Sequence, residues 1–446
     1  MARQTFSPHL TPRALGDGLV LRQATRRDRK AIAEFNGAIH GSEHDQPPEI
    51  DKWTRDLLSG DHPTCGLEWF TLVEDTATRE IVSSLCLIGA TWTYGGLPFG
   101  VGIPELVGTK KEYRRRGLIR AQFDVIHEWS KAAGHLVQAI GGIPHFYRQF
   151  GYEMALPMAP GHRGPTTEVP KLKKGAREPL CVRPATRNDL AFITRTYERG
   201  LERCLVAAAM EAGKWRYELD GRTRGGMHHK ELRVIETAGG GRVGFLAHGR
   251  EPAQGRERVN LGAYELAPGV SWLAVTPSVL RYLTDYGQKQ AARVKKGFSS
   301  IDCYLAETHP IFRAAPGFFR HLWGPYAYYI RVGDLARFVR HVRPVLERRL
   351  AESIAAGHTG EVKLSFYRDG LRLVFARGKL RKVETWKPAA GQSAAFPFLT
   401  FLQLLFGRRS LQELQEAYPD CEVTHDCTAV LDLLFPKLPS EVWDAL

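Results

Sequence analysis

The chain has no long apolar run, no hydrophobic N-terminal leader and no cysteines at metal-binding spacing. No stretch of about 18 apolar residues occurs, which excludes an ordinary membrane-spanning helix and makes a membrane partner unexpected. Residues 1–15 are polar, so we expect no export signal. The seven cysteines are scattered, odd in number and never form Cys-x-x-Cys. That pattern favours reduced thiols in a cytoplasmic protein, with neither a disulfide framework nor a metal cofactor.

The composition is that of a folded protein of several domains. The 446 residues are 43% apolar and 25% charged, enough for roughly two to four domains with their own cores. The net charge of +14 raises the question of nucleic acid. The basic residues are spread in short runs without a recognisable nucleic-acid module. We therefore interpret the charge as a generally basic surface and expect no nucleic-acid partner.

A strand, a basic turn and a helix follow one another near residue 110. Residues 101–107 form an apolar run typical of a strand, residues 110–116 are strongly basic, and Gly117 precedes a helical pattern. Free N–H groups and the dipole at a helix start attract phosphate, and the arginines add full charges. Gly117 would let the backbone approach an anion closely. The alternative interpretation is a basic, solvated helix start.

This turn resembles the pyrophosphate loop of the GNAT acetyltransferases, (Arg/Gln)-x-x-Gly-x-(Gly/Ala). The loop here reads Arg114-Arg115-Arg116-Gly117-Leu118-Ile119. Ile119 departs from the pattern, which has a small residue at that place. After a predicted parallel strand at 136–140, the chain continues Phe146-Tyr147-Arg148-Gln149-Phe150-Gly151-Tyr152. That segment resembles the Phe-Tyr-x-x-Phe-Gly-Tyr sequence that closes a GNAT domain.

The chain then repeats itself. Residues 21–28 are echoed by 182–189, and 146–152 by 311–318, which predicts a duplicated domain rather than chance similarity. In the second copy a predicted strand at 271–275 is followed by neither an arginine cluster nor a glycine before Gly287. Phe312 stands where the first copy has Tyr147. We therefore interpret the second copy as a structural partner.

The last part of the chain has another pattern. Residues 334–356 predict a long helix that Pro344 should kink or split, 361–377 predict a hairpin, and 397–406 and 410–417 predict helices. This order resembles a sterol-carrier-protein-like domain. It could equally be a packing platform.

The three parts together resemble the Eis-like (enhanced intracellular survival) acetyltransferases. The resemblance implies an α/β (α+β) fold: two tandem GNAT folds with mixed central sheets, then a sterol-carrier-protein-like α+β domain. The implied domains are 1–158, 178–331 and 332–446, with 156–179 containing a linker. It also implies an acetyl-CoA-dependent N-acetyltransferase that assembles into a homo-oligomer and acts on an aminoglycoside, polyamine or lysine-like amine. The competing hypothesis is a non-catalytic CoA- or lipid-binding module.

The resemblance also assigns roles to residues. The strand edge that would pair with the pantetheine arm comprises Val107, Gly108 and Thr109. The loop that would hold the pyrophosphate comprises Arg115, Arg116, Gly117, Leu118, Ile119 and Arg120.

Tyr147 matches the general acid that protonates the leaving thiolate, with Tyr152 as its competitor. The base would be the terminal carboxylate of Leu446 or the side chain of Glu105. The acceptor cleft could be lined by Glu34, Asp45, Glu49 and Trp53, which we interpret rather as ordinary surface residues.

Overall fold

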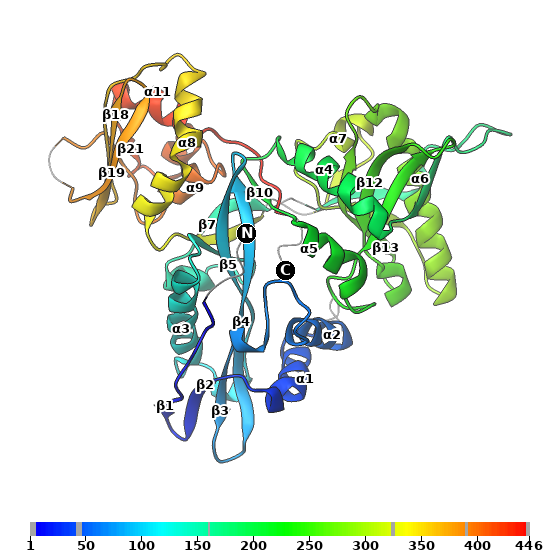
Figure 1. Cartoon of the computed structure of the whole chain (residues 1–446), viewed down its shortest axis with the longest axis horizontal. Helices are drawn as coiled ribbons and strands as arrows, with labels where there is room; N and C mark the ends of the chain where they lie inside the picture. The colour runs from blue at the N-terminus through cyan, green and yellow to red at the C-terminus, as the bar shows by residue number, and fades with distance from the viewer. Residues whose placement is uncertain (1–5, 42–46, 159–160, 323–325, 389–390, 443–446) are drawn as a thin grey trace.

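The computed structural model of the chain describes residues 6–41, 47–158, 161–322, 326–388 and 391–442. Three β-sheets organise these residues, and helices flank each sheet (Figure 1). In spatial order, the first sheet contains β1 (Arg13–Gly16), β2 (Leu19–Gln23), β3 (Phe70–Asp75), β4 (Glu80–Tyr94), β5 (Leu97–Thr109), β6 (Val137–Ile140), β16 (Tyr326–Arg331) and β7 (Glu153–Met158), and β10 (Val206–Ala208) pairs with β4. The second contains β15 (Arg320–His321), β8 (His162–Pro165), β14 (Ser300–Cys303), β13 (Arg258–Leu266), β12 (Arg242–His248), β11 (Glu231–Thr237) and β9 (Leu180–Pro184). The third contains β19 (Lys379–Trp386), β18 (Gly370–Ala376), β17 (Gly360–Ser365), β20 (Ala394–Ala395) and β21 (Glu422–Val423).

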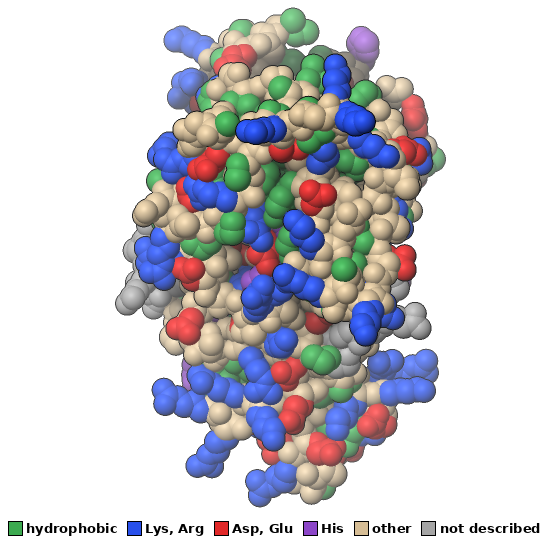
Figure 2. All heavy atoms as spheres, turned by 90° about the vertical axis from the view of Figure 1, so that its right-hand side faces the viewer, with side chains coloured by type: hydrophobic (Ala, Val, Ile, Leu, Met, Phe, Trp, Pro, Cys, Tyr) green, Lys and Arg blue, Asp and Glu red, His purple; other side chains and the backbone are tan. Residues whose placement is uncertain are grey.

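Each sheet combines antiparallel pairs with one parallel pair, so the expected mixed α/β fold is confirmed. The α-helices are α1 (Arg29–His40), α2 (Pro47–Leu58), α3 (Leu118–Ala132), α4 (Leu190–Leu201), α5 (Ala212–Arg216), α6 (Trp272–Arg293), α7 (Ile311–Ala314), α8 (Leu335–Ala351), α9 (Phe401–Leu405), α10 (Leu411–Ala417) and α11 (His425–Leu434). No helix in the described part of the chain is long and apolar enough to span a bilayer. Lys and Arg side chains are scattered among acidic ones over the face drawn in Figure 2, in keeping with a generally basic surface.

The first two sheets exchange strands. β16 follows the second sheet along the chain but inserts between β6 and β7 of the first. β8 precedes most of the second sheet and inserts between β14 and β15 there. Residues 162–165, expected in a linker, are therefore a sheet strand. Arg163 on that strand forms an ion pair with buried Asp302 at 2.7 Å, a pairing that local sequence could not reveal.

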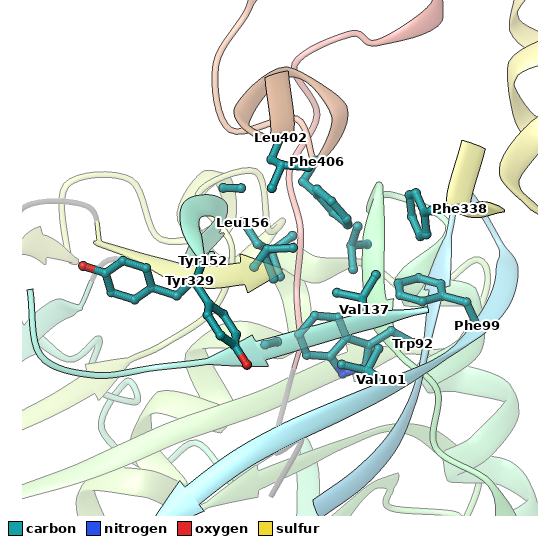
Figure 3. Packing of buried hydrophobic residues seen from close by; sticks show 14 of the residues in the cluster. Trp92, Phe99, Val101, Val137, Tyr152, Leu156, Tyr329, Phe338, Leu402 and Phe406 are labelled. Atoms are coloured by element: carbon teal, nitrogen blue, oxygen red, sulfur yellow. The ribbon is translucent and has the colours of Figure 1, made fainter. Parts of the chain in front are cut away.

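The C-terminal part packs directly on the first sheet. Phe99 of β5 lies edge-on to Phe338 of α8, with ring centroids 5.5 Å apart, and Phe338 stacks on Phe406 at 5.3 Å (Figure 3). The ring of Trp92, on β4, lies edge-on to that of Phe99. The two parts thus share one continuous apolar core.

One predicted strand and one predicted effect of a proline differ from the structure. Residues 271–275 are not a strand, because Ser271 caps α6 by accepting the N–H of Ala274 at 3.3 Å. A short apolar run does not separate a strand from a helix start, and β13 takes the strand position instead. Pro344 does not split α8, which is one unbroken helix of 17 residues from Leu335 to Ala351. The buried face of that helix, including Phe338, stabilises the helix across the proline.

Candidate active site

The start of α3 presents an anion-binding surface. Gly117 is the residue before the helix, with φ 74° and ψ 7°, a left-handed conformation that favours glycine. The first N–H groups of a helix have no partner within it, and the first turn of α3 contains no acidic side chain. Arg115, Arg116 and Arg120 are exposed around it. Arg120 is positioned by a 2.9 Å hydrogen bond that it donates to Gln149.

β5 and β6, the strands that flank α3 in sequence, pair over only a short stretch. The two strands pair in parallel only at Val101 with Val137 and at Gly102 with Gln138. Further along β5, Leu106 adopts φ 53° and the register against β4 shifts, which is a β-bulge. Among the described strands, the edge of β5 after the bulge has its ladder partner on the β4 side alone.

The predicted pantetheine edge, Val107 to Thr109, lies after the bulge. The hydroxyl of Ser83 donates a 2.9 Å hydrogen bond to the carbonyl of Gly108, so β4 supports this edge from one side. A Cβ on Gly108 would lie 2.8 Å from Ile39 and 3.1 Å from the imidazole of His40. Glycine is thus required there because the end of α1 packs against the strand.

Tyr147 lies in a short 3₁₀ turn, Phe146–Phe150, and is only 5% exposed. Its ring packs against Phe146 at 5.1 Å and Tyr329 at 5.6 Å. Burial raises the pKa of Tyr147 above the usual phenol value, and the charge of Glu105 raises that pKa further. The phenol is therefore held protonated, as a proton donor must be.

Tyr152, the competitor, is in a different environment. It is fully buried, and its hydroxyl lies 3.0 Å from Nε2 of His127, so that hydroxyl already has a partner. Burial also raises the pKa of Tyr152 and lowers the pKa of His127 to about 3. Figure 3 shows Tyr152 within the apolar cluster that includes Tyr329. Its surroundings are those of a core residue.

Glu105 occupies β5 immediately before the bulge. Burial raises the pKa of its carboxyl to about 8, against a smaller opposing effect of the N–H of Leu106. A carboxyl with this pKa can accept a proton near neutral pH. The charge of Glu105 also contributes to the raised pKa of Tyr147. Leu446 lies outside the described residues, and the last described strand bridge joins Glu441 to Ala207.

Of the predicted acceptor residues, those on α2 contact the second half of the chain. Glu49 is buried and forms an ion pair with Arg256 at 2.8 Å, and the ring of Trp53 lies 4.5 Å from that of His228. Asp56 on the same helix accepts hydrogen bonds from the N–H and hydroxyl of Thr223.

Glu34 is exposed near Lys30, at 3.7 Å. Asp45 lies outside the described part of the chain. α2 thus packs on the second half of the chain, and the carboxylates of Glu49 and Asp56 are engaged in contacts with it.

We expect Arg256→Ala to lower the free energy of unfolding by about 3 kcal/mol, because it leaves the buried Glu49 carboxylate unpaired. Denaturant unfolding followed by tryptophan fluorescence measures this. The control is Arg187→Ala, which breaks the exposed pair with Asp220 and should cost less than about 1 kcal/mol. Equal, small losses in both variants would show that α2 is not held by the buried pair.

Sequence reasoning missed the residues that reach the site from far along the chain. Tyr329 accepts a 2.5 Å hydrogen bond from the N–H of His145, beside Tyr147. Tyr326 donates to the carbonyl of Gly142. Both tyrosines come from β16, about 180 residues away in sequence, and no local pattern identifies them. Tyr326 also lines a cavity of about 730 Å³ between β7, Arg408 and residues 437–440.

Part of the chain matches a known family model, and the chain is similar in fold to several solved structures. Residues 21–155 match a family model described as an acetyltransferase (GNAT) domain. A GCN5-related N-acetyltransferase from Anabaena variabilis has TM-score 0.63 at 14% identity, over 95% of this chain and 98% of that one. Eis1 from Mycobacterium abscessus has TM-score 0.58 at 13% identity, over 96% and 99%. Saccharomyces cerevisiae N-myristoyltransferase with bound myristoyl-CoA has TM-score 0.51 at 10% identity, over 72% and 84%.

At these identities the likeness to the solved structures concerns the fold alone. The comparison with curated proteins gave no match. The residues matched by the family model include the basic turn, Glu105 and Tyr147.

Proposed function

We propose that this chain is an Eis-like N-acetyltransferase that transfers an acetyl group directly from acetyl-CoA to an amine. The observation that supports it most is the start of α3, with Gly117 and three exposed arginines, together with the β5 edge that β6 does not pair after Gly102. In this proposal the amides of Gly117, Leu118, Ile119 and Arg120 hold the diphosphate, with Arg115 and Arg116 adding charge. The pantetheine arm pairs with Val107 to Thr109.

Acetyl-CoA supplies the acetyl group as a thioester, and the residues of the chain move two protons. The amine acceptor is cationic at neutral pH and must lose a proton before it can attack. Tyr147 then donates its phenolic proton to the departing thiolate. Direct transfer needs no covalent enzyme intermediate, which accords with burial raising the pKa of several cysteine thiols, including Cys86 and Cys303.

We assign the base to Glu105, because its raised pKa suits proton transfer and because its charge acts on the pKa of Tyr147. The terminal carboxylate of Leu446 is the second candidate. Glu441 pairs with Ala207 of β10, which lies beside Trp92 of β4. Four residues follow Val442. Because an extended chain spans at most about 3.5 Å per residue, the reach of the terminal carboxylate from Val442 is at most about 14 Å.

If Glu105 is the base, kcat/KM should rise with pH through about 8, because only the ionised carboxylate accepts a proton. Glu105→Gln should remove that rise and lower the activity at pH 8 by at least about tenfold. A pH series of CoA release measures both. If one glycine added after Leu446 abolishes turnover while Glu105→Gln retains the full profile, the terminal carboxylate is the base instead.

The acceptor is proposed by class: an aminoglycoside, a polyamine or a lysine side chain. The cavity lined by Tyr326 is our candidate for the acceptor site. The hydroxyl of Tyr326 donates a hydrogen bond to the carbonyl of Gly142, and a Cβ on Gly142 would lie 2.8 Å from the ring of Tyr147. CoA release with one amine of each class tests the function. Binding of CoA without turnover on any of them would contradict it.

A second candidate function, lipid binding by a sterol-carrier-protein-like C-terminal domain, has one specific observation in its favour. A cavity of about 560 Å³ lies between α8, β18 and α9, with Phe366 and Phe401 in its wall and exposed Phe398 at its side. Titration with a fluorescent fatty acid separates this candidate from acetyl transfer. We interpret the residues from 332 onward as a packing platform for the first sheet.

A further inference from the structure

A cluster of metal-ligand residues lies in the second half of the chain, outside the proposed acetyl-transfer site. It consists of His162 on β8, His321 on β15 and Glu307 in the loop after β14. One donor atom from each residue lies within 4.8 Å of the other two. The positions are 145 and 14 residues apart in sequence, so the fold alone brings them together.

The strand exchange explains where the cluster lies. In the first sheet, Tyr329 of the exchanged strand pairs with Ile140 and its ring packs on Tyr147 at 5.6 Å. In the second sheet, His162 of the exchanged strand pairs with Cys303 and its ring packs on Phe312 at 4.5 Å. The cluster therefore occupies the counterpart of the surroundings of Tyr147. Phe312 has no hydroxyl, so the same place in the second half cannot donate a proton as Tyr147 does.

The backbone positions two of the three ligands firmly. His162 and His321 are directly paired residues of adjacent antiparallel strands, and their ring centroids are 4.5 Å apart. His162 is buried, whereas His321 and Glu307 are exposed. The paired cross-strand position places the two imidazoles side by side.

The basic residues on the two strands that carry the histidines, Arg163 and Arg320, already have carboxylate partners. Arg163 binds Asp302 at 2.7 Å, and Arg320 binds Glu168 at 2.6 Å.

We propose that His162, Glu307 and His321 bind a divalent transition-metal ion, with Zn²⁺ as the preferred one. Two neutral imidazoles and one carboxylate are a recurrent Zn²⁺ ligand set, with bonds of about 2.0–2.2 Å and a fourth position open. Glu307 also lines the cavity of about 730 Å³. Water or a ligand can complete the coordination at that fourth position. This site departs from the expectation of no metal, which considered the spacing of cysteines and not a cluster formed by the fold.

Calorimetric titration of ZnCl₂ into the chelator-stripped full chain, without an affinity tag and with reduced thiols, tests the proposal. We expect one ion per chain. Loss of an outer-shell partner already weakens metal binding by about 10- to 100-fold. His321→Ala and Glu307→Gln, which remove exposed ligands, should therefore each weaken binding at least tenfold. The control His425→Ala changes an exposed histidine at the start of α11 and should bind as the original chain does.

Binding of Co²⁺ provides a second readout, which tests whether any of the seven cysteines is a ligand of the metal ion. The Co²⁺-loaded chain should show ligand-field absorption without a thiolate charge-transfer band, and His321→Ala should lose that absorption. No stoichiometric binding, equal binding by His321→Ala, or a thiolate band would each overturn the proposal.

Discussion

Replacing Tyr147 with phenylalanine should lower kcat by about 100- to 10,000-fold, the usual contribution of a general acid. The substitution removes only the hydroxyl, and the ring contacts with Phe146 and Tyr329 remain. CoA affinity should therefore stay within about twofold, because the proposed contacts to the diphosphate lie on α3. Steady-state CoA release and calorimetry with CoA measure the two quantities separately.

The matched control for that variant is Tyr152→Phe. It removes a more deeply buried hydroxyl, which is bonded to His127 at 3.0 Å. We expect a loss of about 1 kcal/mol in stability and only a small change in kcat. Full turnover by Tyr147→Phe, or a larger loss in Tyr152→Phe, would show that the proton donor has been misassigned.

Replacing Gly117 with alanine should weaken CoA binding by about 100-fold, or about 2.7 kcal/mol. The residue has φ 74°, a conformation that costs an L-residue about 1–2 kcal/mol. The added methyl group would also lie where the diphosphate must approach the backbone. Calorimetric titration with CoA gives the affinity directly.

Gly134, at the other end of α3, is a close control for strain. It has φ 82°, and a Cβ there would meet no atom within 4 Å, as at Gly117. Gly134→Ala therefore imposes a similar backbone penalty without touching the proposed site, and its CoA affinity should be unchanged. If the two alanine variants lose affinity equally, the effect is general strain and not an anion site at Gly117.

The sequence predicts those features of the fold and the site that depend on residues close together in the chain. The strand before Gly117 and the helix after it were predicted because apolar spacing, a basic turn and a glycine lie within 20 residues. The left-handed conformation of Gly117 accords with that pattern. Tyr147 is predicted from a short motif and Glu105 from its place on the strand before the loop, and the charge of Glu105 acts on the pKa of Tyr147. Their catalytic roles stay predictions.

The parts that could not be predicted depend on distant pairing. β16 reaches the first sheet from the end of the second half, and nothing in its six residues shows which sheet accepts it. Glu49 was considered for the acceptor cleft, yet its partner Arg256 lies about 200 residues away. Ser271 was placed in a strand because four apolar or small residues follow it, although the same residues suit a helix with a serine cap.

Hydrogen–deuterium exchange of the full chain, with and without CoA, tests the central claim most directly because it locates the ligand. The proposed site predicts protection of the amides from Arg115 to Gln122 and along β5 after Leu106, with no change at the start of α6. Protection around Ser271 to Ser278 instead, or none anywhere at saturating CoA, would contradict a diphosphate site at Gly117.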